Sequence, residues 1–297
     1  MTAPDPSLAI RPMIIGADGL VGGALAALLE PRFPHTVSAT RTEMDIADRW
    51  ATELDIERLD PTVVINTAAI SNVDEAEQDP ETAAEINAEG AAHLAAICRR
   101  GHRRLIHLST DYVFDGLAGR EYVEEDLTAP VNAYGRTKLQ GEEAILGELA
   151  DAVVLRISFV FGPGRETFFD RIAREAVSGA GPIRAIDGWV TKPTYNRDIA
   201  RAVLALLADP GATGLFHFAN GGAVSRFAFA REVVRLAGGD PARVEPIAPE
   251  SLDLPAARPP ATPLATGLFA GRFGWAPRPW TDAAREYLAE FPPKAAS

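Results

Sequence analysis

A tyrosine and a lysine stand four positions apart in the segment AYGRTKLQGEE, residues 133–143, as Tyr134 and Lys138. Four residues make about one turn of an α-helix, so in a helix both side chains lie on the same face. A phenol next to an ammonium can protonate a developing alkoxide, which is the acid step in the reduction of a ketone. The pair could equally be a solvated helix face on which Lys138 extends beside an aromatic ring. The rest of the chain must decide.

A second group of polar side chains follows a buried apolar run. RLIHLSTDYVFDG, residues 104–116, passes from apolar residues to Thr110, Asp111 and Tyr112. Ligands of parallel sheets bind beyond the carboxyl ends of the strands, so these side chains are expected to face a substrate. We predict that Thr110 hydrogen-bonds a substrate carbonyl and that Tyr134 protonates it. Lowering the pKa of the phenol from about 10 towards neutrality requires roughly 4 kcal/mol, which the Lys138 ammonium and an oxidised nicotinamide ring could supply together.

The segment GADGLVG, residues 16–22, contains Gly16, Gly19 and Gly22 between a predicted strand and a predicted helix. Such glycines let the backbone turn tightly and approach a pyrophosphate, whose charge the helix N-terminus stabilises. We therefore predict a dinucleotide site formed by these glycines with Leu20 and Val21. The strand before and the helix after the loop are the context that this mechanism requires.

Arg41 follows the second predicted strand, where an acidic residue would bind the ribose 2′-hydroxyl of NAD. A guanidinium pairs instead with the 2′-phosphate of NADP, so NADPH is predicted, with NADH left open. Alternatively, Arg41 simply points into solvent. Further cofactor contacts are predicted near the ends of the second and third strands and at the tyrosine and lysine of AYGRTKLQGEE. These residues are Asp45, Ile46, Asn66, Ala68, Ala69, Tyr134 and Lys138.

Strands and helices alternate through the first 160 residues. Strands are predicted over residues 12–16, 35–40, 62–68, 103–109 and 152–162. Helices are predicted from Leu20, from Pro80 with Asp79 as its cap, and around Tyr134. This alternation is typical of an α/β fold with a doubly wound, Rossmann-like parallel sheet.

The regular alternation of predicted strands and helices ends after Gly162. Helices are predicted over residues 168–177 and 197–207 and a strand over 214–220, whereas the last 75 residues are rich in proline and loops. We predict a dinucleotide-binding domain over residues 1–160. Residues 161–297 would form mainly a smaller substrate-binding lobe, with roughly residues 190–220 returning to the first domain.

The composition excludes several classes of protein. The chain has 297 residues, 47% of them hydrophobic and 24% charged, as in ordinary globular proteins. Its net charge of −12 argues against a nucleic-acid partner, and no apolar stretch reaches the length of a membrane span. The opening residues lack the pattern of a secretory signal, and Cys98 is the single cysteine, so a cytoplasmic location is predicted. The five histidines lack metal-ligand spacing, so no metal site is predicted.

Taken together, the motifs resemble those of the dTDP-4-dehydrorhamnose reductase family, a branch of the extended short-chain dehydrogenases/reductases. The resemblance covers nearly the whole chain and rests on GADGLVG, NTAAISNVDEAE, STDYVFDG, PVNAYGRTKLQGE, LRISFVFG, KPTYNRDIA, GLFHFAN and RPPATPL. It implies that Thr110, Tyr134 and Lys138 form the catalytic set. It also implies a nucleotide-linked 4-keto-6-deoxy sugar, with dTDP as the expected nucleotide, as the substrate.

Departures from the family pattern bear on the sugar. Phe159 stands where family members usually have a tryptophan that lines the sugar site, and Trp189 and Lys192 stand near the place of a missing glycine. These departures suggest a specialised 4-ketoreductase, for example one that makes a deoxysugar for a secondary metabolite. Arg258 is a candidate for the substrate diphosphate, although it could be a surface arginine between prolines. The substrate-binding residues are thus predicted as Thr110, Asp111, Tyr112, Phe159 and Arg258.

Other functions remain open on the same fold. A 4,6-dehydratase is disfavoured, because its family has a glutamate after the aspartate where this chain has Tyr112. An epimerase could use the same threonine, tyrosine and lysine and would recycle its cofactor. A non-catalytic NADP-binding protein, similar to the regulatory subunit of methionine adenosyltransferase, is the alternative from another class. A homodimer is considered, without a motif that establishes it.

Overall fold

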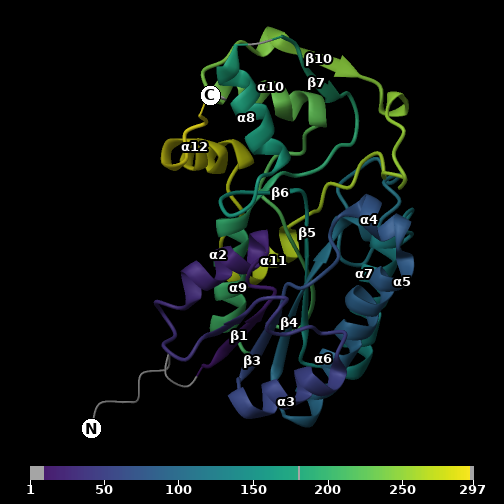
Figure 1. Cartoon of the computed structure of the whole chain (residues 1–297), viewed down its shortest axis with the longest axis vertical. Helices are drawn as coiled ribbons and strands as arrows, with labels where there is room; N and C mark the ends of the chain where they lie inside the picture. Colours follow the sequence, from purple (N-terminus) through teal and green to yellow (C-terminus); the bar gives the residue numbers. More distant parts are fainter. Residues whose placement is uncertain (1–9, 180, 295–297) are drawn as a thin grey trace.

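A computed structural model of the chain describes residues 10–179 and 181–294. Its largest element is a parallel sheet of six strands in the order β2-β1-β3-β4-β5-β9 (Figure 1). The strands are β1 Pro12–Ile15, β2 Val37–Ala39, β3 Val63–Asn66, β4 Arg104–Thr110, β5 Val153–Ile157 and β9 Gly214–Phe218. The chain leaves β1 for β2 on one side and returns to β3 on the other. This reversal opens a crevice at the carboxyl ends of β1 and β3, where ligands of such sheets bind.

Helices cover both faces of this sheet, because successive strand residues point to opposite faces. Ile14 and Ile65 pack against α2 Leu20–Leu29 and α9 Asn196–Ala208, with α11 Gly267–Phe273 beside them. Met13, Ile15 and Val64 pack on the opposite side. The helices there are α3 Arg49–Leu59, α4 Val73–Gln78, α5 Pro80–Ala84, α6 Ala91–Arg100 and α7 Ala133–Glu148. The predicted fold class is confirmed.

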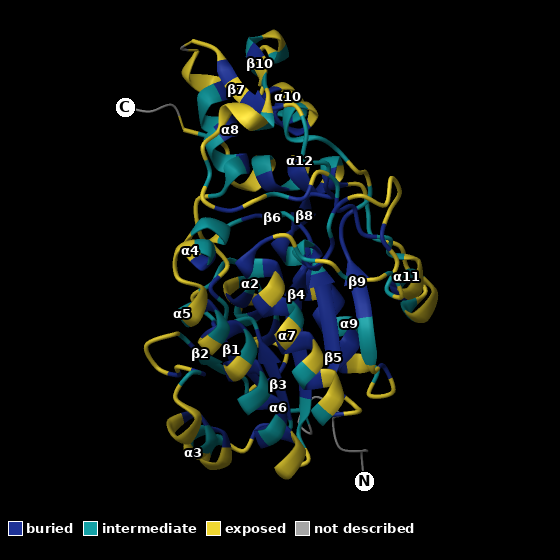
Figure 2. Ribbon diagram, turned by 90° about the vertical axis from the view of Figure 1, so that its right-hand side faces the viewer, coloured by how far each residue is buried: buried dark blue, intermediate teal, exposed yellow. Residues whose placement is uncertain are grey.

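A second group of elements lies above the sheet in Figure 1 and has a core of its own. It comprises α8 Phe168–Ser178, β7 Ile183–Ile186, α10 Arg226–Leu236, β10 Val244–Ile247 and α12 Trp280–Glu290. Figure 2 shows buried residues at the centre of both groups. The last 75 residues, expected to be rich in proline and loops, also contain helices, and Phe229 and Val233 at helical spacing bury one face of α10. The division into two domains stays a prediction.

The single strand predicted over residues 152–162 is broken in two. β5 ends at Ile157, and β6 Val160–Phe161 pairs with β8 Thr194–Tyr195 in a separate small sheet. Between them Phe159 has a φ of 33°, in the left-handed region, which a strand cannot accommodate. The break turns the chain out of the large sheet and towards the second group of elements.

The long helix predicted from Pro80 is continuous with α6 but contains a π-helical segment, Glu85–Gly90. Its start is as predicted, since Asp79 accepts a hydrogen bond from the Thr82 amide and Pro80 occupies the first turn. Within the π segment the Asn87 carboxamide bonds the Ile70 amide at 2.9 Å and carbonyl at 3.1 Å. This contact anchors the chain beyond β3, next to the crevice. No helix among residues 10–179 and 181–294 is long and apolar enough to cross a bilayer.

Candidate active site

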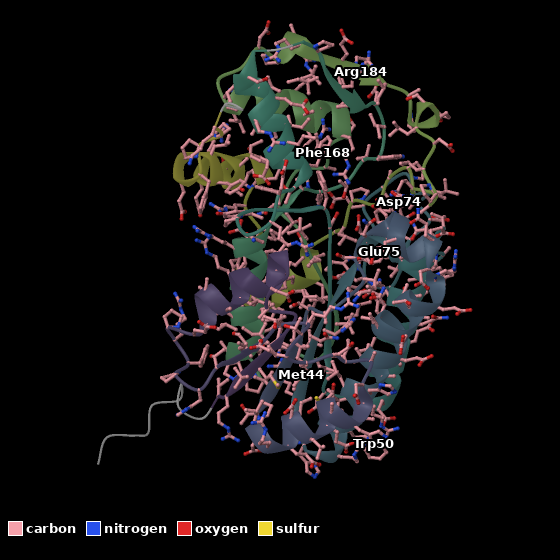
Figure 3. All side chains as sticks on the ribbon, viewed as in Figure 1. Met44, Trp50, Asp74, Glu75, Phe168 and Arg184 are labelled. Atoms are coloured by element: carbon pink, nitrogen blue, oxygen red, sulfur yellow. The ribbon has the colours of Figure 1, made fainter. Side chains whose placement is uncertain are left out.

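A cleft of about 680 Å³ opens at the carboxyl ends of β1, β3 and β4, between the sheet and the second group of elements. Every predicted site residue lines it except Asn66 and Arg258. Residues far apart in the sequence therefore meet in one place. Glu75 in α4 also lines the cleft, and Phe168 belongs to the group of elements above it, as labelled in Figure 3. The predicted constellation is thus brought together, although its individual roles stay predictions.

The glycine loop forms one end of the cleft. Gly16 has a φ of 84°, and a Cβ on Gly22 would lie 2.1 Å from the Gly16 carbonyl oxygen, so a larger residue cannot occupy position 22 unless the loop shifts. α2 begins directly after Gly19, whose residue type offers no side-chain cap, and its first turn contains no acidic residue. The helix N-terminus therefore presents its partial positive charge to the cleft, which fits a pyrophosphate.

Arg41 lies at the same end, exposed and lining the cleft. Its backbone amide donates to Asp18 Oδ1 at 3.4 Å, so the Asp18 carboxylate lies next to the backbone of Arg41. Asp45, Ile46, Ala68 and Ala69 complete this end, as predicted. The small side chains of the two alanines leave room beside β3. The loop, the open helix terminus and the cation together fit a dinucleotide with an additional phosphate.

Tyr134 enters the cleft from the first turn of α7. That turn is fixed because Asn132 caps the helix, accepting from the Gly135 amide at 2.8 Å. A Cβ on Gly135 would lie 2.1 Å from the Tyr112 carbonyl oxygen, so glycine lets α7 pack directly on the segment after β4. The rings of Tyr134 and Tyr112 meet edge to face, with centroids 5.9 Å apart. The phenol is thereby held beside Thr110, at the end of β4.

The protonation of Tyr134 differs from the expectation. Burial raises the pKa of its phenol, a hydrogen bond with Thr110 opposes this, and Asp111 and Tyr112 raise the pKa further. Lys138 is not among the groups that shift it, so the protein alone does not lower the pKa as predicted. A raised pKa keeps the hydroxyl protonated at neutral pH. The phenol is therefore loaded as a proton donor.

Lys138 is almost fully buried one turn along α7. Its Nζ donates to the Leu108 carbonyl at 2.7 Å and lies 3.0 Å from His107 Nε2. Burial lowers the pKa of Lys138 to about 8, and the nearby Glu142 carboxylate only partly opposes this. Lys138 therefore lies at the floor of the cleft and releases its proton more readily than an ordinary lysine.

The tautomer of His107 follows from its neighbours. Asn66 Oδ1 accepts from the Ala68 amide at 3.0 Å, so its Nδ2 is the atom that lies 3.0 Å from His107 Nδ1. Nδ1 must accept this bond, because an amide nitrogen can only donate. Burial lowers the pKa of His107 far below its ordinary value, so the ring is neutral and carries its proton on Nε2, facing Lys138. Lys138 can accept a hydrogen bond from this N–H only as a neutral amine, so the His107 proton disfavours the ammonium form of Lys138. Asn66, predicted as a cofactor contact, here positions His107 and does not line the cleft.

The lowered pKa of Lys138 should make the difference in unfolding free energy between the wild type and Lys138→Met depend on pH. Below pH 8 Lys138 is protonated in both folded and unfolded states, and burial of the ammonium costs the wild type the full penalty. Between pH 8 and 10.5 the unfolded chain keeps the proton that the folded chain has released, so the wild type gains stability relative to the variant. We expect a gain of roughly 3 kcal/mol from pH 7 to pH 10.5. Urea unfolding of both proteins across this range measures it, and a constant difference would contradict the lowered pKa.

A buried ion pair supports this floor from behind. Arg156 in β5 and Glu142 in α7 pair at 2.6 Å, with side chains 4% and 2% exposed. The guanidinium also lies over the Phe114 ring, 5.0 Å from its centroid, and the Ser109 hydroxyl donates to Glu142. The pair thus ties α7 to β4 and β5. Sequence reasoning missed it, although Glu142 follows Lys138 by one helical turn and so shares its face.

Asp111 is a buried hub. Its Oδ2 accepts hydrogen bonds from Thr262 at 2.5 Å, Ser158 at 3.0 Å and Thr191 at 3.3 Å, and its Oδ1 accepts from Thr110 at 3.2 Å. Burial raises its pKa, and the hydroxyls of Thr262, Ser158 and Thr110, together with the charge of Arg226, oppose the shift. Three distant segments are joined to the end of β4 in this way. Asp111 was predicted to bind substrate, and its oxygens are here largely occupied by the protein.

The far wall of the cleft contains Phe159 and a cation that sequence reasoning missed. Arg226, the first residue of α10, lies over the Phe159 ring with its Cζ 3.1 Å from the ring centroid. Both residues line the cleft. Burial raises the pKa of Tyr112, and the charge of Arg226 opposes that rise, which places the guanidinium beside Tyr112 as well. Only the folded chain reveals Arg226, because AVSRFAFAR reads as an ordinary helix start.

Arg258 lies outside the cleft. It donates from Nη2 to Asp74 Oδ2 at 2.8 Å and from Nη1 to the Ala256 carbonyl at 2.7 Å. The hydrogen bond from Arg258 holds the pKa of Asp74 below its ordinary value. Asp74 stands at the start of α4 (Figure 3). The predicted diphosphate contact therefore already has a carboxylate partner. Lys192, one of the departures from the family pattern, likewise pairs with Glu121 at 2.7 Å.

Comparisons with known proteins agree with this arrangement. The family model described as the RmlD substrate binding domain matches residues 10–292. A dTDP-4-dehydrorhamnose reductase of Mycobacterium tuberculosis is 42% identical over 253 residues, covering 84% of this chain and 82% of that protein. A "probable dTDP-4,6-dihydroxy-2-methyloxan-3-one 4-ketoreductase" of Streptomyces antibioticus is 38% identical over 293 residues, covering 96% and 98%.

A solved structure adds the same family name. The dTDP-4-dehydrorhamnose reductase of Bacillus anthracis, crystallised in complex with NADP, superposes with a TM-score of 0.89 at 26% identity, covering 95% of this chain and 99% of that one. The family model spans almost all of the described residues, and the similarity to both curated relatives extends over most of their length. The chain therefore belongs to the RmlD family, the family of the dTDP-4-dehydrorhamnose reductases.

Proposed function

We propose that this protein reduces the 4-keto group of a dTDP-linked 4-keto-6-deoxy sugar with NADPH. The observation that carries the proposal is that Thr110, Tyr134 and Lys138 line the same cleft as the glycine loop. Curated relatives named as 4-ketoreductases of dTDP-linked sugars, and a relative's complex with NADP, support it.

The chain's own residues account for the acid half of the reaction. When bound, the reduced nicotinamide supplies the hydride. The Thr110 hydroxyl then orients the substrate carbonyl towards Tyr134, and the phenol donates its proton to the oxygen as the negative charge develops. Because burial raises the pKa of Tyr134, the donor is protonated before the reaction begins. Lys138 holds the floor of the cleft through Leu108 and can donate a further hydrogen bond to the cofactor ribose.

Cofactor choice provides a first test. Arg41→Ala should raise the Kd of NADPH about 10-fold or more, because a charge-assisted contact with the 2′-phosphate is lost, and should change the Kd of NADH less than about twofold. Fluorescence titration of both cofactors measures the change. Arg49→Ala, an exposed arginine outside the cleft, is the matched control. An unchanged preference in Arg41→Ala would assign the phosphate to another residue.

The reaction itself is tested by incubating the protein with NADPH and a dTDP-4-keto-6-deoxy sugar. One equivalent of NADPH oxidised for each equivalent of sugar reduced supports the reductase. Tightly bound cofactor that is recycled without net consumption would support the epimerase, and NADPH binding without turnover on any such sugar would support a regulatory protein. The intact Thr110, Tyr134 and Lys138 geometry favours the reductase over the regulatory protein.

Two further proposals accompany this function. A cytoplasmic location is proposed, because the proposed substrate and cofactor are both soluble nucleotides. A homodimer is also proposed, to be measured by sedimentation. Neither enters the chemistry of the site.

A further inference from the structure

The wall of the cleft opposite the glycine loop contains a cation that the proposed chemistry does not use. Arg226 stacks on Phe159 and lies 5.9 Å from the Phe168 ring centroid, so aromatic surface covers part of its guanidinium. Within residues 10–179 and 181–294 it forms no ion pair. Its Nη1 atom is buried and has no hydrogen-bond partner among these residues.

An unpaired N–H in such a place is costly. A buried donor without an acceptor loses its hydration and gains nothing in return. Burial accordingly lowers the pKa of Arg226 to about 10, opposed by the negative charge of Asp111 and by Tyr112. The guanidinium still carries its charge at neutral pH. A ligand oxygen that reached Nη1 would therefore form a charge-assisted bond and remove the penalty.

The position of Arg226 indicates which part of the substrate it meets. It lies beside Tyr112, whose ring contacts Tyr134, the proposed proton donor. The group reduced and the group that Arg226 touches are thus separated by about one side chain. That distance corresponds to the sugar ring and not to the nucleotide at its far end. Arg226 belongs to α10, so it would contact the sugar from the wall opposite the glycine loop.

The geometry of the unpartnered donor, Arg226 Nη1, also favours a sugar hydroxyl. Arginine usually binds phosphate through two parallel N–H groups. In Arg226, Nη1 is buried without a partner, while Tyr112 hydrogen-bonds the guanidinium and Phe159 covers its face. A single acceptor such as a hydroxyl oxygen matches this one unpartnered nitrogen.

We propose that Arg226 Nη1 donates to a ring hydroxyl of the 4-keto sugar, and that this contact selects sugars with a complete set of ring hydroxyls over deoxygenated ones. The inference rests on the proposed function and deepens it by naming the class of sugar. The two relatives differ in this respect. The Streptomyces antibioticus name specifies hydroxyls at positions 4 and 6 of its oxanone ring, so the carbon between them carries no oxygen. The sugar of dTDP-4-dehydrorhamnose keeps that oxygen.

The test compares three substrates: a dTDP-4-keto-6-deoxyhexose and its 2-deoxy and 3-deoxy analogues. The wild type should prefer the full sugar over at least one analogue by about 10- to 100-fold in kcat/KM, the value of a hydrogen bond to a charged group. In Arg226→Met that preference should fall to within about threefold, while kcat/KM for the same analogue stays nearly constant. Activity on the analogue shows at once that the variant is folded.

Two controls define the role. Arg231→Met removes an exposed arginine from the same helix and should leave the preference unchanged. The Kd of dTDP, measured by calorimetry, should be the same in Arg226→Met and the wild type, since the nucleotide does not touch Arg226. Arg226→Lys keeps the charge without the planar guanidinium and should restore only part of the preference.

The outcomes separate this inference from the proposed function. If the wild type reduces none of the three sugars, the proposed function fails. If it reduces them but the preference survives in Arg226→Met, or kcat/KM falls equally for all three, the inference fails and the function stands. A weaker Kd for dTDP in Arg226→Met would likewise overturn the inference, because it would assign the guanidinium to the diphosphate.

Discussion

Tyr134→Phe is expected to lower kcat by about 10²- to 10⁴-fold, the usual contribution of a positioned general acid. The substitution removes one hydroxyl and keeps the ring that packs edge to face on Tyr112. Loss of the bond to Thr110 leaves the Thr110 hydroxyl its contacts with the Tyr112 amide and Asp111. Binding of NADPH should change less than about twofold, because the cofactor loop lies at the other end of the cleft. Single-turnover kinetics and a fluorescence titration measure the two quantities.

Tyr112→Phe is the matched control for that experiment. It removes the same group from the neighbouring ring, which lines the same cleft. Because Tyr112 is not the proposed donor, its loss should reduce kcat far less than the loss of the Tyr134 hydroxyl. Full activity in Tyr134→Phe, or equal losses in the two variants, would remove the Tyr134 phenol from the mechanism.

Arg156→Met is expected to cost about 3–5 kcal/mol of unfolding free energy, the largest loss of stability anticipated for a single substitution near the site. It leaves the Glu142 carboxylate, 2% exposed, without the cation that donates three hydrogen bonds to it, from Nε and Nη2 of Arg156. The Ser109 hydroxyl alone cannot replace that charge. Urea unfolding at pH 7 measures the loss.

Two further variants test whether the loss comes from the unpaired buried charge. Arg285→Met breaks the exposed pair with Asp282 and should change stability by less than about 1 kcal/mol. Arg156→Met combined with Glu142→Leu should recover part of the loss, because no unpaired charge then stays buried. A loss below about 1 kcal/mol in Arg156→Met would contradict the expected cost of leaving a buried carboxylate unpaired.

Much of the fold follows from local sequence. Alternating apolar strands and amphipathic helices indicate the parallel sheet, and GADGLVG indicates the crevice, because both signals depend on residues close together in the chain. The same holds for Tyr134 and Lys138, which one helical turn brings together. The predicted family, fold class and cofactor loop therefore needed no long-range information.

The contacts that sequence reasoning missed join distant residues. Thr262 reaches Asp111 across 151 positions, and Arg258 finds Asp74 across 184. Arg226 joins Phe159 only because Phe159 adopts a left-handed backbone that ends β5 early. No periodicity predicts such pairs, since each depends on where the second group of elements sits on the sheet. For the same reason the sequence does not show that, in the protein alone, burial and not the lysine nearby in sequence dominates the pKa of Tyr134.

Transfer of hydride to carbon 4 of the sugar, with Tyr134 protonating the oxygen, is the step on which the proposed function depends. Its most direct test is NMR of the product formed from a dTDP-4-keto-6-deoxy sugar and NADPH that carries two deuteriums at nicotinamide carbon 4. We expect one deuterium at sugar carbon 4 for each NADPH oxidised, with almost no product from Tyr134→Phe. Product whose ring hydrogens come only from solvent, with NADPH left unoxidised, would contradict it.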